Sequence, residues 1–210
     1  MKIALFLITT FIIDEDSELF KKKKLTNNKT RLEHYINGIK SIDFFKHDII
    51  LLDNSSSLEK LPSSLKKIIT SNPNIQYINN TKNIFGKLNK TAGVIDVYKK
   101  NIDLLKNYDV IIHFEPRQKI VDNFFFFLPG NNFYIDKTNR QFHTGLFSID
   151  SINFIKFLNK YNPEDVVKNK LQFESILFKF VDENNIKFNK VDKLGLIWYD
   201  SYKKDKETII

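Results

Sequence analysis

The chain has 210 residues, enough for one large core, and its 42% hydrophobic and 28% charged residues are typical of a soluble globular protein. Its 33 Lys and Arg residues outnumber 25 Asp and Glu, and the net charge of +8 favours polyanions: nucleic acid, an anionic membrane surface or a phosphorylated small ligand. The lack of cysteine excludes disulfides, thiolate zinc sites and thiol nucleophiles. Because no linker divides the chain, we expect one domain over residues 1–210.

The first apolar run, Ile3–Thr9, predicts a central parallel strand because both of its faces are apolar. Residues 1–13 combine one lysine with an apolar run, as a signal peptide does. However, they lack a small-residue cleavage site and fall short of the ~20 apolar residues that cross a bilayer. We therefore expect a cytoplasmic protein without a transmembrane segment. The positive charge leaves peripheral association with a membrane surface open.

A helix and a second buried strand are predicted next. Residues 30–46 carry apolar side chains every three or four positions, which is typical of a helix packed on a sheet. The apolar strand Ile49–Leu52 then ends in Asp53. At the tip of a rigid strand, this carboxylate can accept hydrogen bonds from a sugar hydroxyl or a base NH group. The alternative is a turn aspartate that binds loop amides.

Residues 74–117 organise the rest of the prediction. They indicate a strand at 75–78, a polar loop at 79–87, a helix at 88–105 and a buried strand before Glu115. Elements in this order form a parallel crossover unit, and ligands of such sheets bind beyond the carboxyl ends of the strands. We therefore expect the polar loop, Glu115 and Arg117 to line one crevice.

The polar loop has the composition of an anion site. Gly86 permits a tight turn or a close backbone approach, and three lysines lie near the start of the helix, namely Lys82, Lys87 and Lys90. Because a helix amino end also attracts anions, this segment suits a diphosphate.

The strand that closes this unit presents a carboxylate. Alternation places His113 and Glu115 on one face of the strand and Phe114 on the other. Pro116 cannot continue a central strand, so Glu115 should be the last strand residue and should point into the mouth of the crevice. The alternative is a structural ion pair between Glu115 and Arg117.

The remaining elements are less sharply patterned. Residues 118–132 predict a helix closed by Pro129 and Gly130, and the segments 133–136 and 142–150 predict strands, the second entered through His143. His143 is interpreted either as a ligand contact or as a structural histidine. A helix is expected over residues 163–185, and residues 186–202 are expected to close the chain as a strand or edge hairpin.

Glu174 lies in an unfavourable place on that last helix. With ~100° per residue, Val167, Phe178 and Val181 fall within about 40° of it. A carboxylate in an apolar stripe is costly unless it is paired or has a chemical role. Desolvation would suit a general base, and the alternative is an ion pair with Lys170.

Together, these segments resemble the GT-A glycosyltransferases, most closely the inverting group that includes polysaccharide-building bacterial enzymes and a small chlorella-virus enzyme. The resemblance covers residues 2–185. The segments on which the resemblance rests are, in chain order, ALFLITTF, LLDNSSS, NNTKNIFGKLNKTAG, YDVIIHFEPR, HTGLFSI and QFES. They are similar to the opening strand, the base-binding "vDNgSxD" segment, the ribose and diphosphate loop, the DxD strand, the acceptor segment and the acidic position on the following helix.

The resemblance implies a three-layer α/β sandwich with a mainly parallel central sheet. It also implies a hexosyltransferase that moves a sugar from a nucleotide diphosphate sugar, with UDP favoured, to a hydroxyl of a glycan or lipid-linked acceptor with inversion. The implied nucleotide-sugar contacts are Thr9, Thr10, Phe11, Asp53, Asn83, Gly86, Lys87 and Arg117. The implied acceptor contacts are His143, Thr144 and Gly145, with Glu174 as the catalytic base.

The chain departs from the family at the metal motif. Where the family has DxD, this sequence has Glu115, Pro116 and Arg117. Either Glu115 binds Mn²⁺ or Mg²⁺ with help from water and the diphosphate, or Arg117 and the lysines replace the metal charge, or activity is lost.

Two other classes of protein are alternatives to a glycosyltransferase. A nucleotidyltransferase is disfavoured because no glycine-rich loop follows the first strand. A degenerate sugar- or nucleic-acid-binding module remains the non-enzyme alternative, although the scattered basic residues make nucleic acid an unfavoured partner.

Overall fold

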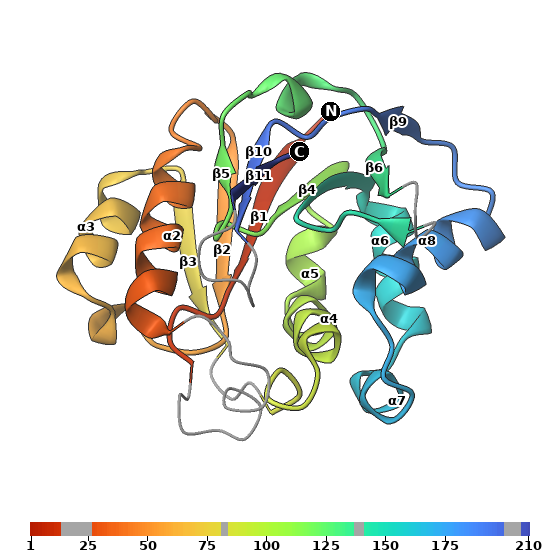
Figure 1. Ribbon diagram of the computed structural model, residues 1–210. Helices are drawn as coiled ribbons and strands as arrows, with labels where there is room; N and C mark the ends of the chain where they lie inside the picture. The colour runs from red at the N-terminus through yellow and green to blue at the C-terminus, as the bar shows by residue number, and fades with distance from the viewer. Residues whose placement is uncertain (14–26, 81–83, 137–140, 200–206) are drawn as a thin grey trace.

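The computed structural model describes residues 1–13, 27–80, 84–136, 141–199 and 207–210. Within these ranges, eight strands form a central sheet in the order β3-β2-β1-β4-β8-β6-β7, with β9 beside β6 (Figure 1). Their bounds are β1 (Ile3–Thr9), β2 (Asp48–Asp53), β3 (Ile75–Asn79), β4 (Val110–Phe114), β6 (Asn132–Asp136), β7 (Gln141–Phe142), β8 (Leu146–Asp150) and β9 (Asn189–Val191). The first four strands are mutually parallel, and β8 is antiparallel to β4. The predicted mainly parallel α/β fold is confirmed.

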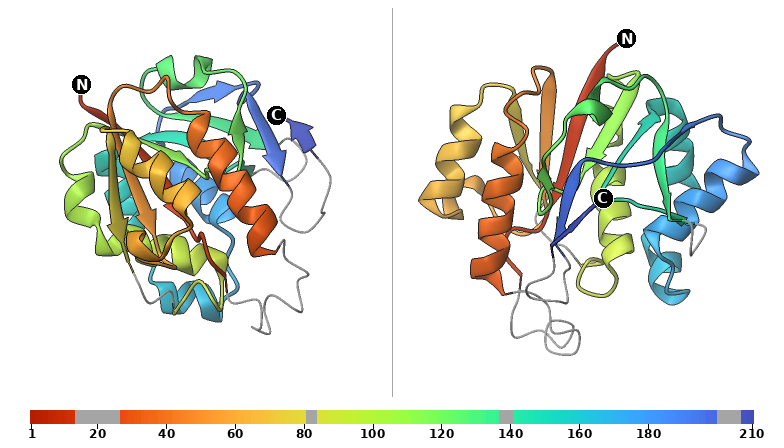
Figure 2. Two further views of the ribbon diagram at one scale, coloured as in Figure 1. Left: turned by 90° about the vertical axis from the view of Figure 1, so that its left-hand side faces the viewer. Right: turned by 45° about the horizontal axis from the view of Figure 1, so that its top comes forward.

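Helices cover both faces of this sheet, as Figures 1 and 2 show. One face carries α2 (Asn28–Lys40) and α3 (Ser63–Ser71). The other face carries α4 (Lys90–Lys100), α5 (Ile102–Leu105), α6 (Ser151–Lys160), α7 (Pro163–Lys168) and α8 (Phe173–Glu183). The two faces have separate cores because alternate residues of each central strand point to opposite sides. In β1, Phe6 packs towards α4, while Leu5 and Leu7 pack towards α2.

A second, small sheet lies on the α2 side. It consists of β5 (Lys119–Ile120), β10 (Leu196–Tyr199) and β11 (Glu207–Ile209), and the left view of Figure 2 shows the C-terminal strands next to the green β5. The expected closing strand is therefore two strands in two sheets. Gly195, with a φ of +68°, turns the backbone between them, and a side chain there would meet Asp122.

The expected helix over residues 118–132 is wrong. This segment forms β5 and a short 3₁₀ helix, η2 (Phe124–Phe127). Phe126 packs against Phe44 and Phe45 from the end of the α2 segment, with ring centroids 5.1 and 5.8 Å away. Phe127 is 73% exposed. The conformation of the phenylalanine run is therefore set by contacts with residues that are distant in sequence and not by a helical periodicity.

Three expected helices are shorter than predicted. The helix over 30–46 ends at Lys40, and the helix over 88–105 divides at Asn101 into α4 and α5. The helix over 163–185 divides into α7 and α8. Lys170 has a φ of +51° there, which no helix interior accommodates. This break places Glu174 in the first turn of α8. The other short helix among the described residues is η1 (Leu58–Lys60).

Candidate active site

The strand order reverses between β1 and β4. After β1 the chain adds β2 and β3 on one side, then crosses back to place β4 on the other side of β1. In such open sheets, ligands bind outside the carboxyl ends of the strands at this point of reversal. Thr9 ends β1, and Glu115 follows β4, so both lie at this edge.

A small cavity lies at the end of β4. It is lined by residues of β4 and its end, of α4, of the loop before β8 and of α8, namely Lys90, Thr91, Val94, His113, Glu115, Thr144, Phe173 and Glu174. Its volume of about 20 Å³ suits one water molecule or one functional group of a ligand. The expected convergence of Glu115, Glu174 and the segment after His143 is therefore seen in the structure. Asp53 is not part of this lining.

Glu115 is buried between two cations. Its Oε1 lies 2.7 Å from Lys90 Nζ, and its Oε2 lies 3.6 Å from the Arg117 guanidinium. Burial alone would raise the pKa of the Glu115 carboxyl, but the charges of Lys90 and Arg117 outweigh it and lower this pKa to about 2. Glu115 is thus ionised at neutral pH. The expected alternative of a Glu115–Arg117 pair is present, although Lys90 is the closer partner.

The two cations differ in freedom. The Arg117 side chain is 7% exposed, whereas the Lys90 side chain is 61% exposed. Lys90 opens α4, whose N-cap Asn89 accepts a hydrogen bond from the Ala92 amide. The cap therefore fixes where the lysine leaves the backbone, and its side chain remains free to turn towards a ligand.

His113 shares the cavity with Glu115, and Phe114 packs in the opposite core, as alternation predicts. The His113 ring stacks on Phe147, with centroids 4.8 Å apart. Its Nδ1 lies 2.7 Å from the Tyr98 hydroxyl. Burial is the main cause that lowers the pKa of His113 to about 4, so the ring is neutral at pH 7.

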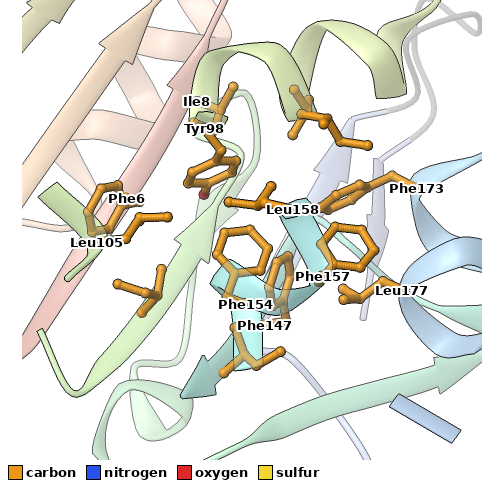
Figure 3. Close-up of a cluster of buried hydrophobic side chains, with 14 of the residues drawn as sticks. Phe6, Ile8, Tyr98, Leu105, Phe147, Phe154, Phe157, Leu158, Phe173 and Leu177 are labelled. Atoms are coloured by element: carbon orange, nitrogen blue, oxygen red, sulfur yellow. The ribbon is translucent and has the colours of Figure 1, made fainter. Parts of the chain in front are cut away.

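Tyr98 itself belongs to the aromatic core under α4, which Figure 3 shows. Its ring meets Phe154 edge to face, with centroids 4.8 Å apart. Burial raises the pKa of the Tyr98 hydroxyl well above its ordinary value, so the hydroxyl keeps its proton.

Glu174 lies beside the acceptor segment predicted from the sequence. The Thr144 hydroxyl donates a 3.0 Å hydrogen bond to Glu174 Oε1. Glu174 is only partly buried, so solvent reaches it. No ion pair between Lys170 and Glu174 occurs in the described part of the chain. Of the two interpretations made for Glu174, the ion pair is therefore wrong.

The rest of the acceptor segment is tightly packed. The His143 ring meets the Trp198 ring edge to face at 4.3 Å, and burial is the main cause that lowers the pKa of His143 to about 4. The Gly145 carbonyl oxygen accepts a hydrogen bond from the Glu115 amide at 2.9 Å. A Cβ at Gly145 would come within 2.6 Å of Trp198, so only glycine fits there.

Asp53 is closed off from solvent. It has 0% exposure, and its carboxylate accepts hydrogen bonds from the Ser55 amide and hydroxyl and from the Phe11 amide. Burial raises the pKa of Asp53 to about 6, although these hydrogen bonds oppose the rise. The geometry is that of the turn aspartate considered as the alternative in the sequence. Its predicted contact with a nucleotide stays a prediction.

The end of β1 is held by two residues that the sequence did not single out. Tyr35 accepts a hydrogen bond from the Thr10 amide at 3.1 Å, and the Arg31 guanidinium donates to the Thr10 carbonyl at 3.0 Å. Thr9 and Phe11 are buried, and the Thr10 hydroxyl donates to Asn54. Arg31 is 7% exposed, and burial is the main cause that lowers its pKa.

The predicted diphosphate loop is described only in part. Asn83 and Lys82 lie outside the described residues. Gly86 lies in the turn before α4, and Lys87 is exposed beside it. Across the described residues, no group of three or more His, Asp or Glu side chains is arranged as a metal site. None of the helices in these ranges is long and apolar enough to span a membrane.

Comparison with solved structures identifies the fold. The galactosyltransferase LgtC, solved with donor and acceptor sugar analogues, is 12% identical, with a TM-score of 0.50 over 84% of this chain and 69% of that one. The chain has a GT-A fold. A protein from Desulfovibrio desulfuricans G20 assigned as a nucleotide-diphospho-sugar transferase gives a TM-score of 0.49 at 9% identity, over 91% of this chain and 80% of that chain. No protein-family model matches the sequence, and no curated protein matches it.

In this chain, the cavity lies at the end of β4, at the edge of the sheet where the strand order reverses. A likeness at 12% identity shows the fold alone.

Proposed function

We propose that the protein is a glycosyltransferase that moves a sugar from a nucleotide diphosphate sugar, UDP-linked in the first instance, to a hydroxyl of a glycan or lipid-linked acceptor. One observation carries the proposal: a partly exposed carboxylate, Glu174, lines the same cavity as Glu115, whose buried carboxylate pairs with the exposed Lys90 and the buried Arg117 at the ligand-binding edge of the sheet. A base for the acceptor and cations for the leaving group are the two needs of sugar transfer.

Glu174 is the proposed general base. Thr144 holds one of its oxygens by a hydrogen bond, which orients the carboxylate and leaves the other oxygen for the acceptor. As the acceptor oxygen attacks the anomeric carbon, the bond to the diphosphate breaks and the acceptor proton passes to Glu174. The diphosphate leaves with the electron pair of that bond. Attack opposite the leaving group inverts the anomeric carbon.

Lys90 and Arg117 are the proposed partners of the departing diphosphate. The exposed ammonium of Lys90 can turn to a phosphate, and the guanidinium of Arg117 is fixed by burial. Together, Lys90 and Arg117 would stabilise the negative charge that develops on the leaving oxygen. Such electrostatic stabilisation is usually the largest single contribution to the rate.

A divalent ion does not fit the described residues around Glu115. A Mg²⁺ ion keeps several waters and is bound by one or two carboxylates together with substrate phosphates, so it needs a carboxylate oxygen that does not already face a cation. Here Glu115 is the single carboxylate at the end of β4, and both its oxygens face cations. Glu115 as a Mn²⁺ or Mg²⁺ ligand therefore remains a prediction that we do not build on, and the proposed reaction relies on Lys90 and Arg117.

Asp53 receives a different role from the one expected. Because it is fully buried and bonded to the Phe11 amide and to Ser55, we propose that it shapes the end of β1 where the nucleoside would lie. Thr10, half-buried at the same end, is the residue there that a nucleoside could contact.

The Glu174→Gln variant tests the base. It keeps the shape and the Thr144 contact but cannot take a proton, so we expect the transfer rate to fall by about 10²–10⁴-fold while donor binding changes little. The donor is found first by calorimetric titration of UDP-, GDP- and dTDP-sugars, with and without Mn²⁺. Glu183→Gln is the matched control, since Glu183 is on the same helix but pairs with Lys160 at the surface. A Glu174→Gln rate within a few fold of the unmodified protein would refute the assignment.

A further inference from the structure

Two buried polar atoms of the cavity lack partners. Among the described residues, His113 Nε2 and Glu115 Oε2 are both shielded from solvent and make no hydrogen bond. Both residues line the cavity. Buried polar atoms are normally paired, and leaving one unpaired is costly, so two such atoms at one cavity indicate a missing partner.

The Tyr98 contact indicates which kind of atom His113 Nε2 is. A tyrosine hydroxyl can donate or accept, and His113 Nδ1, at 2.7 Å, is the one hydrogen-bond partner of the buried Tyr98 hydroxyl among the described residues, so we assign Tyr98 as the donor. A neutral imidazole carries one proton, so an accepting Nδ1 places that proton on Nε2. His113 therefore carries an N–H donor without a partner on a ring that lines the cavity.

Glu115 presents the opposite chemistry. It is ionised, and an ionised carboxylate only accepts hydrogen bonds. Arg117 lies 3.6 Å from Oε2, which provides charge but no hydrogen bond. A donor from His113 and an acceptor from Glu115 together match a hydroxyl group, which accepts one hydrogen bond and donates one. The cavity volume of about 20 Å³ suits a group of that size but not a whole sugar ring.

We propose that His113 and Glu115 together bind one hydroxyl group of the transferred sugar. The inference rests on the proposed function, because that function places the diphosphate at Lys90 and Arg117, the two cations that contact Glu115. The sugar is bonded to that diphosphate, so its hydroxyls are the nearest ones of the ligand. Tyr98 then acts as a positioning residue, since it sets the tautomer of His113.

The tautomer is tested without any ligand. In the full protein labelled with ¹⁵N-histidine, we expect two of the four histidines, His113 and His143, to be neutral from pH 5.5 to 8, and we expect the His113 ring to carry its proton on Nε2. That signal should be absent from His113→Phe. A proton on Nδ1 of His113 would overturn the inference, because Nε2 would then be a second acceptor beside Glu115.

The hydroxyl is tested with deoxy analogues of whichever nucleotide sugar binds in the calorimetric screen. We expect one monodeoxy analogue to bind the unmodified protein about 10–100-fold more weakly than the parent sugar. In the double variant Tyr98→Phe, His113→Phe, that loss should shrink to about threefold or less. The double variant removes both partners of the buried hydrogen bond and retains the rings, so it disturbs folding less than either single change.

The outcomes separate the two ideas. If the unmodified protein binds no nucleotide sugar, the proposed function fails and this inference fails with it. If a nucleotide sugar binds but every deoxy analogue binds equally well, water fills the cavity and only this inference fails. The same holds if the deoxy penalty is as large in the double variant as in the unmodified protein.

Discussion

The strand tips on the two sides of β1 each carry a buried carboxylate, and the two carboxylates have opposite environments. Asp53, at the end of β2, accepts hydrogen bonds from neutral donors, and burial raises its pKa to about 6. Glu115, after β4, lies between Lys90 and Arg117, which lower its pKa to about 2 against the effect of burial. Asp53 has no exposed surface, whereas Glu115 has an unpaired oxygen beside a cavity.

This difference supports a structural role for Asp53 and a place in the ligand site for Glu115. The hydrogen bonds of Asp53 to the Phe11 amide and to Ser55 connect the end of β2 to the end of β1. The charges around Glu115 exceed what one carboxylate needs, because two cations face it. Excess positive charge at the ligand edge of a sheet attracts an anion, and a departing diphosphate is such an anion.

Among changes at the two strand tips, the largest expected effect comes from removing the exposed cation that pairs with Glu115. Lys90→Met should lower the rate of sugar transfer by about 10²–10³-fold, because a charge that stabilises the leaving diphosphate is lost. Lys100→Met is the matched control, since Lys100 lies at the other end of α4 and pairs with Asp96. Steady-state rates of both variants check the prediction. Equal losses in the two variants would mean that Lys90 acts only through the stability of α4.

The pH dependence of stability sharpens the comparison for Asp53. Its pKa is raised from 3.8 to about 6 on folding, so the folded protein holds a proton that the unfolded chain releases. The resulting stabilisation is fully present below about pH 4 and is lost as the pH rises through 6. Between pH 4 and 7, the free energy of unfolding of the unmodified protein should fall by roughly 2 kcal/mol relative to Asp53→Asn. Urea titrations measure this difference, and the exposed Asp43→Asn should track the unmodified protein.

Glu115 should show the opposite sign. Its pKa is lowered from 4.5 to about 2 on folding, so its ionised form stabilises the protein above pH 4.5 and the contribution is lost as the pH falls towards 2. Glu115→Gln should therefore be less stable than the unmodified protein at pH 7. The gap should narrow as the solution is acidified, and urea titrations from pH 3 to 7 would show it. A gap that widens on acidification would contradict the assigned environment.

The sequence predicted the central strands and the crossover unit better than the segments that connect them. Apolar strands and the crossover unit around α4 were predicted because each is a local pattern. Pro116 indicated the end of β4, although the strand ends at Phe114, one residue earlier than the expected Glu115. The helix expected over residues 118–132 was wrong because Phe126 packs on residues that are distant in sequence. No local period contains such a contact.

The site shows the same division. Glu115 and Glu174 were identified from local pattern and come together at one cavity. Arg31 and Tyr98 were missed, although they hold Thr10 and His113, because both lie on helices whose apolar spacing already accounted for them. A buried arginine one turn before a tyrosine was the available signal, since a cation on the inner face of a helix requires partners.

The smallest expected effects come from the N-caps of the two helices that lie next to the strand tips. Asn89 caps α4, which begins with Lys90, and Asn27 caps α2, which holds the end of β1 through Arg31. Asn89→Ala and Asn27→Ala should each lower the free energy of unfolding by about 1 kcal/mol, because each leaves a helix amide without its acceptor. Only Asn89→Ala should also weaken binding of the nucleotide sugar, by a few fold, since the lysine leaves the backbone one residue after the cap. Calorimetric titration of both variants with the same sugar separates the effects. If Asn27→Ala weakened binding as much as Asn89→Ala did, the diphosphate would depend on both strand tips, and the contrast between them would not hold.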